Sequence, residues 1–310
     1  MSKYTIGVDV GGTNIKFGLV NAQGRIIFRT RLETKGFIRN KPKLIRSLVE
    51  KILEILDVNN LKKKNVLGVG FGFPGLVDPL TGVIKQLPNI PGWKDVPIKK
   101  ILESKLRIPI FIENDVKLIT LGEWRYGAGR GYQNLICMTL GTGVGSGLVL
   151  NNQLYRGENF VAGELGHVPL NEHGPKCNCG GWACYERYVG NQTILKSGQK
   201  YLRGHRIERI EDIHALAKRG NVKAKVFWKQ MGEQIGNGLI GVINLLNPRL
   251  IIMGGGVSNN FVLFQQSLKK IIKSRTMKVQ GSTVKISRTQ LGDDAGIIGA
   301  HVLIKDQTIG

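Results

Sequence analysis

The chain has 310 residues, of which 42% are hydrophobic and 7% aromatic, as in an ordinary globular protein. This composition excludes a disordered tail protein and a collagen-like fibre, and the length predicts two domains of roughly 100–200 residues each. Lysine and arginine number 45 and aspartate and glutamate 22, a net charge of +23, and glycine is frequent at 42 residues. The charge suits an anionic partner, but the basic residues are dispersed, which is more typical of a solvated surface than of a nucleic-acid footprint.

The first part of the chain is predicted to form a compact α/β unit. Residues 4–10, 15–20 and 25–34 are rich in Ile, Val, Phe and Thr and are separated by glycine-containing turns, which predicts a three-stranded meander. Helical spacing of apolar residues predicts a helix over 42–58. A strand over 66–73, a loop rich in Gly and Pro, a helix near 98–106, a strand over 108–113 and a helix from residue 114 follow.

The second half opens with the same pattern. Placing Gly12 on Gly141, an offset of 129, also aligns Thr13 with Thr142 and residues 18–20 with residues 147–149. Residues 131–155 have no charge, but glycines at 141, 143, 145 and 147 interrupt them. They therefore predict two strands joined by a glycine turn rather than a membrane span.

Helices over 210–219, 222–246, 261–274 and 295–304 and strands over 249–253 and 284–287 are predicted in the remainder. We therefore expect two similar α/β lobes with a cleft between them. The smaller would comprise residues 1–115 joined by the C-terminal helix 295–310, and the larger residues 116–294. No apolar leader is visible at the start of the sequence, so we expect a soluble, cytoplasmic protein.

Three glycine-rich turns are candidates for binding a nucleotide. Glycine lets backbone N–H groups approach a phosphate, and an aspartate at the end of the preceding strand is suited to holding hydrated Mg²⁺. The first turn lacks the Gly-Lys-Ser/Thr ending of a P-loop and is not a Rossmann fingerprint. A tight hairpin is the structural alternative for each turn, but three together favour a nucleotide. The residues are Asp9, Gly11, Gly12 and Thr13; Gly141, Thr142 and Gly143; and Gly254, Gly255 and Gly256.

The sequence Glu113-Asn114-Asp115 follows an apolar strand and opens a helix. Asn and Asp are good N-cap residues, which is the structural interpretation. The functional interpretation places Asp115 at a strand's carboxyl end, where it would accept a proton from a hydroxyl that attacks a phosphate. Position along the chain does not decide between them.

Three of the four cysteines form a cluster, Cys177-x-Cys179-x₄-Cys184, with His167 ten residues before it. Three thiolates and an imidazole suit a closed, structural, tetrahedral Zn²⁺ site. A disulfide is disfavoured by the expected compartment and by the odd number of cysteines in the cluster. His173 is a competing fourth ligand, and the remaining Cys137 lies in an apolar strand and is expected in the core.

Two glutamates accompany this cluster, Glu164 just before His167 and Glu186 two residues after the last cysteine. A metal would fix the loop that contains them, and paired carboxylate acceptors suit sugar hydroxyls. Surface carboxylates without a binding role are the alternative.

Together these motifs resemble the ROK family (repressors, open reading frames and kinases) over almost the whole chain, and the His/Cys cluster with its flanking glutamates is its most specific feature. The resemblance implies a two-lobed, actin-like, ribonuclease-H-type ATPase fold. The family's kinases phosphorylate hexoses with ATP and Mg²⁺, commonly as dimers or tetramers. A homo-oligomer with a small-molecule sugar substrate is therefore expected, with no nucleic-acid or membrane partner.

The resemblance also implies roles by position. Asp115 matches the catalytic base, and the glycine turns match phosphate and adenosine loops. His167, Cys177, Cys179 and Cys184 match the zinc ligands. The positions that match sugar contacts are Asn89, Asn114, Asp115, Glu164, His167 and Glu186. Departures from the family pattern are Val116 and Lys117 after the Glu-Asn-Asp motif and Trp182-Ala183 in the cysteine loop.

The sequence thus predicts an ATP-dependent hexose kinase, with glucose and its 6-hydroxyl as the expected acceptor. A kinase for N-acetylmannosamine, N-acetylglucosamine or fructose is the alternative, and polyphosphate is a possible donor. A sugar-responsive repressor is a further alternative, but the family's repressors place a helix-turn-helix ahead of this fold, and here the first phosphate turn begins near residue 9.

Overall fold

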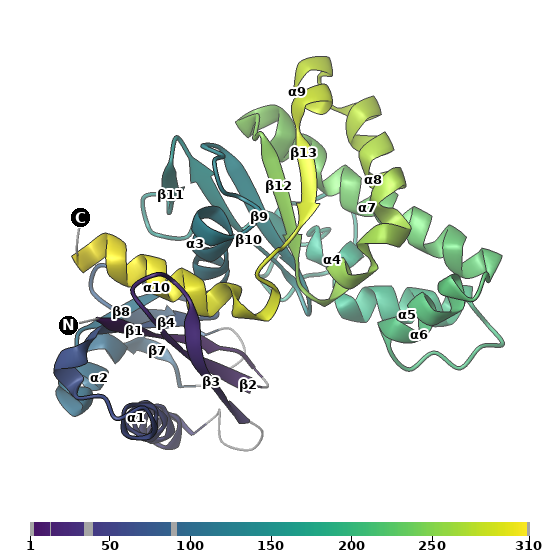
Figure 1. Ribbon diagram of the computed structural model, residues 1–310. Coiled ribbons are helices and arrows are strands. Elements are labelled where there is room, and N and C mark those ends of the chain that lie inside the picture. The colour runs from purple at the N-terminus through teal and green to yellow at the C-terminus, as the bar shows by residue number, and fades with distance from the viewer. Residues whose placement is uncertain (1–2, 13, 34–39, 88–91, 309–310) are drawn as a thin grey trace. The chain divides into compact units, whose positions relative to one another are not determined.

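The computed structural model (Figure 1) describes residues 3–12, 14–33, 40–87 and 92–308. The chain divides into two compact units: unit 1 comprises Met1–Gly131, Leu154–Ala162 and Gln290–Gly310, and unit 2 comprises Tyr132–Gln153 and Gly163–Thr289. The boundary that we expected after residue 115 therefore differs from this division. The helix that begins at Asp115 lies in unit 1, because it packs against the C-terminal helix.

Unit 1 is built on a five-stranded sheet with the order β3-β2-β1-β4-β8. The strands are β1 (Tyr4–Val10), β2 (Asn14–Val20), β3 (Ile26–Glu33), β4 (Val66–Phe73) and β8 (Ile110–Asn114). The first three pair antiparallel, which confirms the predicted meander, and β1, β4 and β8 run parallel.

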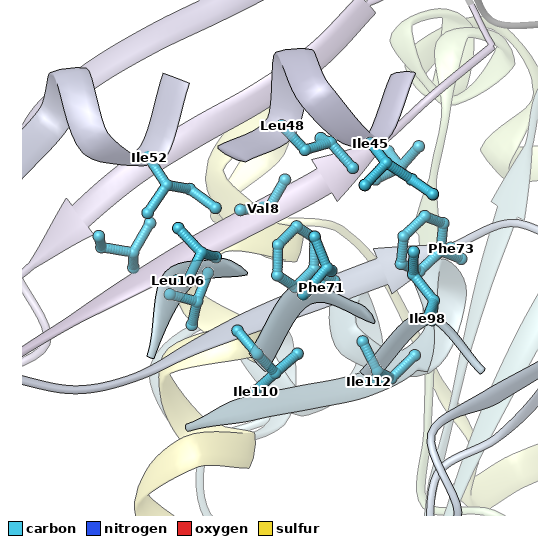
Figure 2. Packing of buried hydrophobic residues seen from close by; sticks show 14 of the residues in the cluster. Val8, Ile45, Leu48, Ile52, Phe71, Phe73, Ile98, Leu106, Ile110 and Ile112 are labelled. Carbon is cyan, nitrogen blue, oxygen red and sulfur yellow. The ribbon is translucent and has the colours of Figure 1, made fainter. Parts of the chain in front are cut away.

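One face of this sheet is covered by α1 (Lys41–Val58) and α2 (Ile98–Leu106). Alternate strand residues such as Val8, Phe71 and Ile110 point toward apolar side chains of these helices (Figure 2). The Asn40 side chain caps α1 by accepting from the Lys43 N–H at 3.1 Å. The predicted helix over 42–58 is confirmed.

The opposite face is covered by α3 (Asp115–Tyr126) and α10 (Ala295–Thr308), which also pack on each other. Glycines make this layer close-packed. A Cβ at Gly7 would lie 2.5 Å from the Ile297 carbonyl oxygen, and one at Gly70 would lie 2.9 Å from the Ala300 Cβ. A Cβ at Gly299 would overlap the Leu118 carbonyl group. Much of the glycine excess in unit 1 therefore serves helix packing rather than turns.

We expected only a loop in the Gly- and Pro-rich stretch after β4, and the structure differs from this expectation. The stretch contains a three-stranded sheet of β5 (Leu76–Asp78), β6 (Val83–Gln86) and β7 (Lys94–Val96) in that order. Strands of three or four residues are too short to show a period-2 pattern, so hydrophobic periodicity did not predict them.

The fully buried Glu123 on α3 fixes two of the three segments of unit 1 that connect to unit 2. Its carboxylate accepts the Ala128 N–H at 2.9 Å just after α3, and the Gln290 and Leu291 N–H groups at 2.9 and 2.8 Å. Buried carboxylates need such partners, because an unpaired one would be costly.

Unit 2 has a five-stranded sheet with the order β11-β10-β9-β12-β13. The strands are β9 (Leu135–Leu140), β10 (Val144–Leu150), β11 (Gln153–Tyr155), β12 (Leu250–Gly254) and β13 (Lys285–Arg288). As in unit 1, the first two strands form an antiparallel hairpin, and the last two, β12 and β13, run parallel to its first strand, β9. The repeat predicted from the glycine motifs is thus present in the topology. The uncharged residues 131–155 contain the two strands β9 and β10 joined by a glycine turn, as predicted.

The helices of unit 2 surround a second core that contains Tyr185, Trp228 and Phe264. The predicted helices near 210–219, 222–246 and 261–274 are confirmed, whereas the helices over 186–189, 191–201 and 278–283 were not predicted. Among the described residues no helix has the length and apolar character to cross a bilayer. The helices are α4 (Glu186–Val189), α5 (Asn191–Tyr201), α6 (Ile210–Lys218), α7 (Val222–Leu246), α8 (Phe261–Arg275) and α9 (Lys278–Thr283).

Candidate functional site

The carboxyl ends of the parallel strands of unit 1 bring its candidate residues to one edge of the sheet. Asp9 on β1 pairs with Gly72 on β4, which pairs with Glu113 on β8, so the three lie in one row. A Cβ at Gly72 would lie 3.2 Å from the Cα of Asp115. Because Gly72 has no side chain, the first turn of α3 lies directly against the strand.

Asn114 and Asp115 form the start of α3. The Asn114 side chain caps the helix by accepting the Val116 and Lys117 N–H groups at 3.0 and 3.1 Å, and its amide donates to the Gly75 carbonyl at 3.1 Å. Asp115 Oδ1 accepts its neighbour's N–H, that of Val116, at 2.8 Å. The structural interpretation of the motif is therefore correct for Asn114, while Asp115 is partly exposed at the first helical position.

The first glycine turn follows β1. The Gly11 N–H donates to the Asn14 carbonyl at 3.1 Å, and a Cβ at Gly12 would meet nothing within 4 Å. Burial raises the pKa of Asp9 above its ordinary value, and the charge of Lys16 opposes this. A carboxylate that lacks enough compensating charge is suited to a cation, which fits the expected Mg²⁺ site. Thr13 and Asn89 lie outside the described residues.

The other two glycine turns are neighbours in unit 2, at the carboxyl ends of the parallel strands β9 and β12. Gly255 has a φ of +79°, and a Cβ there would overlap the Leu140 backbone, so this position requires glycine. The Asn191 N–H fixes the first of these turns by donating to the Gly141 carbonyl at 2.8 Å. Cβ atoms at Gly141 and Gly256 would meet nothing within 4 Å, so the backbone is open to a ligand.

The candidate sugar-binding acids of unit 2 lie against the glycine turn. A Cβ at Gly143 would be 2.5 Å from Glu186 Oε2. His167 lies between the two glutamates, with Nδ1 3.8 Å from Glu186 Oε1 and Nε2 3.9 Å from Glu164 Oε2. The side chain of Glu186 is 20% exposed and that of Glu164 54%, so both can reach a ligand.

The predicted cysteine cluster is assembled. His167, Cys177, Cys179 and Cys184 offer ligand atoms that all lie within 4.8 Å of one another, and His173 is not among them. Residues 177–181 form a tight turn that brings Cys177 and Cys179 close together. The Cys177 N–H donates to the Gly181 carbonyl at 2.7 Å, and Gly180 has a φ of +98°. All four cysteines of the chain are free of disulfides.

The donor set of this cluster fits zinc. Burial raises the pKa of the Cys177 thiol to about 12 and also raises that of Cys184, whereas a backbone N–H from Gly181 lowers that of Cys179. Three adjacent thiols of this kind ionise together only beside a cation. The imidazole atom nearest a thiol is His167 Nδ1, 3.7 Å from Cys177 Sγ, so a metal held there would leave Nε2–H facing Glu164.

Sequence reasoning missed one partner at this site. Glu113 is fully buried and accepts the Arg156 Nε–H at 2.7 Å and the Asn114 N–H at 2.9 Å. A carboxylate at the end of an apolar strand was a usable signal for Glu113. Nothing in the sequence around Arg156 identified its partner, because the two are 43 residues apart.

Known proteins are similar to this chain over nearly its whole length. The ROK family profile matches residues 5–307. A glucokinase from Thermotoga maritima is 31% identical over 98% of this chain and 98% of its own length, and a xylose repressor from Caldicellulosiruptor bescii is 29% identical over 96% and 77%. The solved structure of a ROK family glucokinase from Streptomyces griseus, in complex with glucose and AMPPNP, is 30% identical, with a TM-score of 0.78 over 96% and 97% of the two chains. The expected fold class, that of the two-lobed actin-like ATPases, is confirmed.

Proposed function

Because the chain belongs to the ROK family, and its kinase relatives support a sugar kinase, we propose that it transfers the γ-phosphoryl group of ATP to the 6-hydroxyl of glucose. The observation that supports this best is the contact of Glu186 with the turn at Gly143. A carboxylate suited to sugar hydroxyls thus lies beside a turn suited to phosphates. The glucose-binding, AMPPNP-binding relative supports the same pair of ligands.

In this proposal Asp115 is the general base. It accepts the proton of the sugar hydroxyl as that oxygen attacks phosphorus, and capping of α3 by Asn114 fixes its backbone. Asp9 would hold Mg²⁺, which when bound neutralises charge on the phosphates. The turn at Gly11 and Gly12 lies at the same edge of the sheet, and a phosphate can approach the backbone of Gly12 because no atom lies where a side chain would be.

The acids of unit 2 would orient the acceptor. Glu164 and Glu186 accept hydrogen bonds from sugar hydroxyls, and His167 donates through Nε2–H. Cys177, Cys179 and Cys184, with His167 Nδ1, would hold structural zinc, which fixes the loop that contains these acids. The two glycine turns at Gly141–Gly143 and Gly254–Gly256 are assigned to the phosphates and the adenosine.

A second candidate is a sugar-responsive binding protein without kinase activity, which the similarity to a xylose repressor favours. A third is a kinase for N-acetylmannosamine, N-acetylglucosamine or fructose. The carboxylate pair Glu164 and Glu186 suits all of these sugars, so the hydroxyl pattern must be measured.

The experiment is an ADP-release assay over a panel of glucose, xylose, fructose, N-acetylmannosamine and N-acetylglucosamine, with MgATP and, in parallel, polyphosphate as donor and sugar phosphate detected directly. We expect the highest kcat/KM with glucose and ATP, and glucose 6-phosphate as product. A higher kcat/KM with another sugar corrects the acceptor. Sugar binding by calorimetry without phosphorylation of any sugar would overturn the kinase assignment.

A further inference from the structure

Residues 154–162 form the one internal segment that leaves unit 2 and packs within unit 1, by the division of the chain given above. The segment closes into a loop because the Ala162 N–H donates to the Arg156 carbonyl at 2.9 Å. Gly157 and Phe160 have φ angles of +73° and +62°. The second is unusual for a residue with a Cβ and persists where the surroundings hold it. We call residues 156–162 the clasp loop.

The first attachment of the clasp loop is an ion pair with β8. Arg156 Nε donates to Glu113 Oε2 at 2.7 Å, and the side chains are 28% and 1% exposed. The other oxygen of Glu113 accepts the Asn114 N–H at 2.9 Å. Arg156 therefore fixes the carboxylate that in turn fixes the backbone just before Asp115.

The second attachment comes from the other side of Asp115. Lys117, only 4% exposed, donates from Nζ to the Phe160 carbonyl at 2.5 Å. Its own N–H is bonded to the Asn114 side chain at 3.1 Å. The clasp loop thus contacts the residue two positions before Asp115 and the residue two positions after it.

We propose that the clasp loop is a positioning element, in which Arg156 and Lys117 together hold the turn from β8 to α3 so that the Asp115 carboxylate stays aligned with the attacking hydroxyl. This inference rests on the proposed function only in taking Asp115 as the general base. A base acts when it lies within about 2.6–3.2 Å of the proton's heavy atom, and misplacement by about 1 Å can cost roughly 100-fold in rate.

The loop also leads directly to Gly163 and Glu164. The chain that leads to this proposed sugar-binding acid is therefore held at Phe160 and Arg156, four and eight residues earlier, to the turn that contains the proposed base. This connectivity is the reason to expect an effect on turnover rather than on folding alone.

The first test is Arg156→Met, which keeps an unbranched apolar stem and removes the guanidinium. We expect kcat to fall about 10- to 100-fold, with the calorimetric Kd for the sugar changed less than about threefold. The matched control is Arg29→Met, which removes an exposed ion pair of 2.8 Å with Asp294 in the same unit and should leave kcat unchanged. Unchanged kcat in Arg156→Met would overturn the proposal.

A double variant separates positioning from mere charge compensation. Arg156→Met leaves Glu113 as a buried charge without its cation, which lowers Tm, and adding Glu113→Gln removes that charge. We expect the double variant to regain most of the lost Tm but not the lost kcat, while Arg156→Lys regains part of kcat. Recovery of kcat together with Tm would show that the pair serves stability alone.

A third measurement does not depend on activity. Hydrogen exchange of the free protein should be about tenfold faster at the Asn114, Val116 and Lys117 amides in Arg156→Met than in the wild type, and unchanged in Arg29→Met. Lys117→Met should accelerate exchange in the same turn to a lesser extent. If no sugar is phosphorylated in the ADP-release assay, the kinase assignment fails, but faster exchange in Arg156→Met would still show that the clasp loop holds this turn. Exchange at the wild-type rate at these amides in Arg156→Met would overturn the inference about the clasp loop.

Discussion

The two five-stranded sheets have the same strand order and the same directions, yet their edges contain different chemistry. Asp9 on β1 pairs with Gly72, and in unit 2 the residue that pairs with the corresponding Gly254 is Thr139. The turn of the hairpin is also one residue shorter in unit 2, since Val10 pairs with Ile15 but Leu140 pairs with Val144. A repeated fold thus provides two similar edges, and local substitutions determine what each does.

The two units therefore offer different groups to a ligand. Unit 1 places the carboxylates of Asp9 and Asp115 at its strand ends, which suits a cation and a proton. Unit 2 places glycine turns at the equivalent edge and adds the cysteine cluster with Glu186 beside it.

The largest effect is expected in unit 1, from Asp115→Asn. The amide cannot accept the hydroxyl proton, so kcat should fall by about 10³-fold while the sugar Kd stays within a few-fold. Steady-state kinetics and calorimetry measure the two quantities. The control Asp57→Asn, on the exposed face of α1, should behave as the wild type. A kcat near the wild-type value in Asp115→Asn would contradict the assignment of Asp115 as the general base.

Loss of the metal should act on unit 2. Wild-type protein is expected to contain about one zinc per chain, and Cys184→Ser should lose it, with a lower Tm and a sugar KM raised about 10- to 100-fold. Elemental analysis and kinetics check this. Cys137→Ala, in a buried strand of the same unit, should keep the zinc. Zinc-free wild-type protein, purified without chelators, would contradict the assignment.

The close packing of α10 on α3 in unit 1 is tested by Gly299→Ala on α10. Its Cβ would overlap the Leu118 backbone, so α10 must move away from α3, and unfolding free energy should fall by about 3 kcal/mol. Urea denaturation measures the change. A loss below about 0.5 kcal/mol would mean that the two helices separate easily.

A pH effect is expected from the same layer. His301 on α10 is buried, bonded to the Thr5 hydroxyl at 2.8 Å, and burial lowers its pKa to about 4. In the unfolded chain the pKa of this histidine is about 6.5, so between about pH 4 and 6.5 the unfolded state binds more protons than the folded state. The contribution of neutral His301 to the free energy of unfolding is therefore complete above about pH 6.5 and is lost as the pH drops toward 4. Between pH 7 and 4 the wild type should lose about 2–3 kcal/mol more than His301→Asn. Parallel losses in both proteins would exclude His301 as the source.

The smallest effect has the opposite sign and lies in unit 2. Gly241 is exposed in the interior of α7, and a Cβ there would meet nothing within 4 Å. Gly241→Ala should therefore raise the unfolding free energy by about 0.5–1 kcal/mol, because alanine is the better helix former. Destabilisation in the same urea experiment would show that this position packs against something.

Much of the architecture could be predicted because its signals are local. Helical spacing gave α1, α7 and α8, glycine-separated apolar runs gave both hairpins, and Asn114 was recognisable as an N-cap. The cysteine spacing also predicted a cluster, since ligands close in sequence can meet without a large fold around them. Short strands such as β5 to β7 and the helix α5 were missed, because their patterns are weak over so few residues.

The two repeated hairpins and the types of residue available for chemistry could be read from the chain alone, whereas the N-cap role of Asn114 was one of two interpretations until the structure showed its hydrogen bonds. The folded structure was needed to show that His167 rather than His173 joins the cysteines, and that Arg156 reaches Glu113. It also decided that glycines at 7, 70 and 299 serve helix packing. Each of these contacts depends on which backbones approach one another in space, and no periodic pattern in the chain records that approach, whether the partners are 10 residues apart, as His167 and Cys177 are, or 43 apart, as Arg156 and Glu113 are.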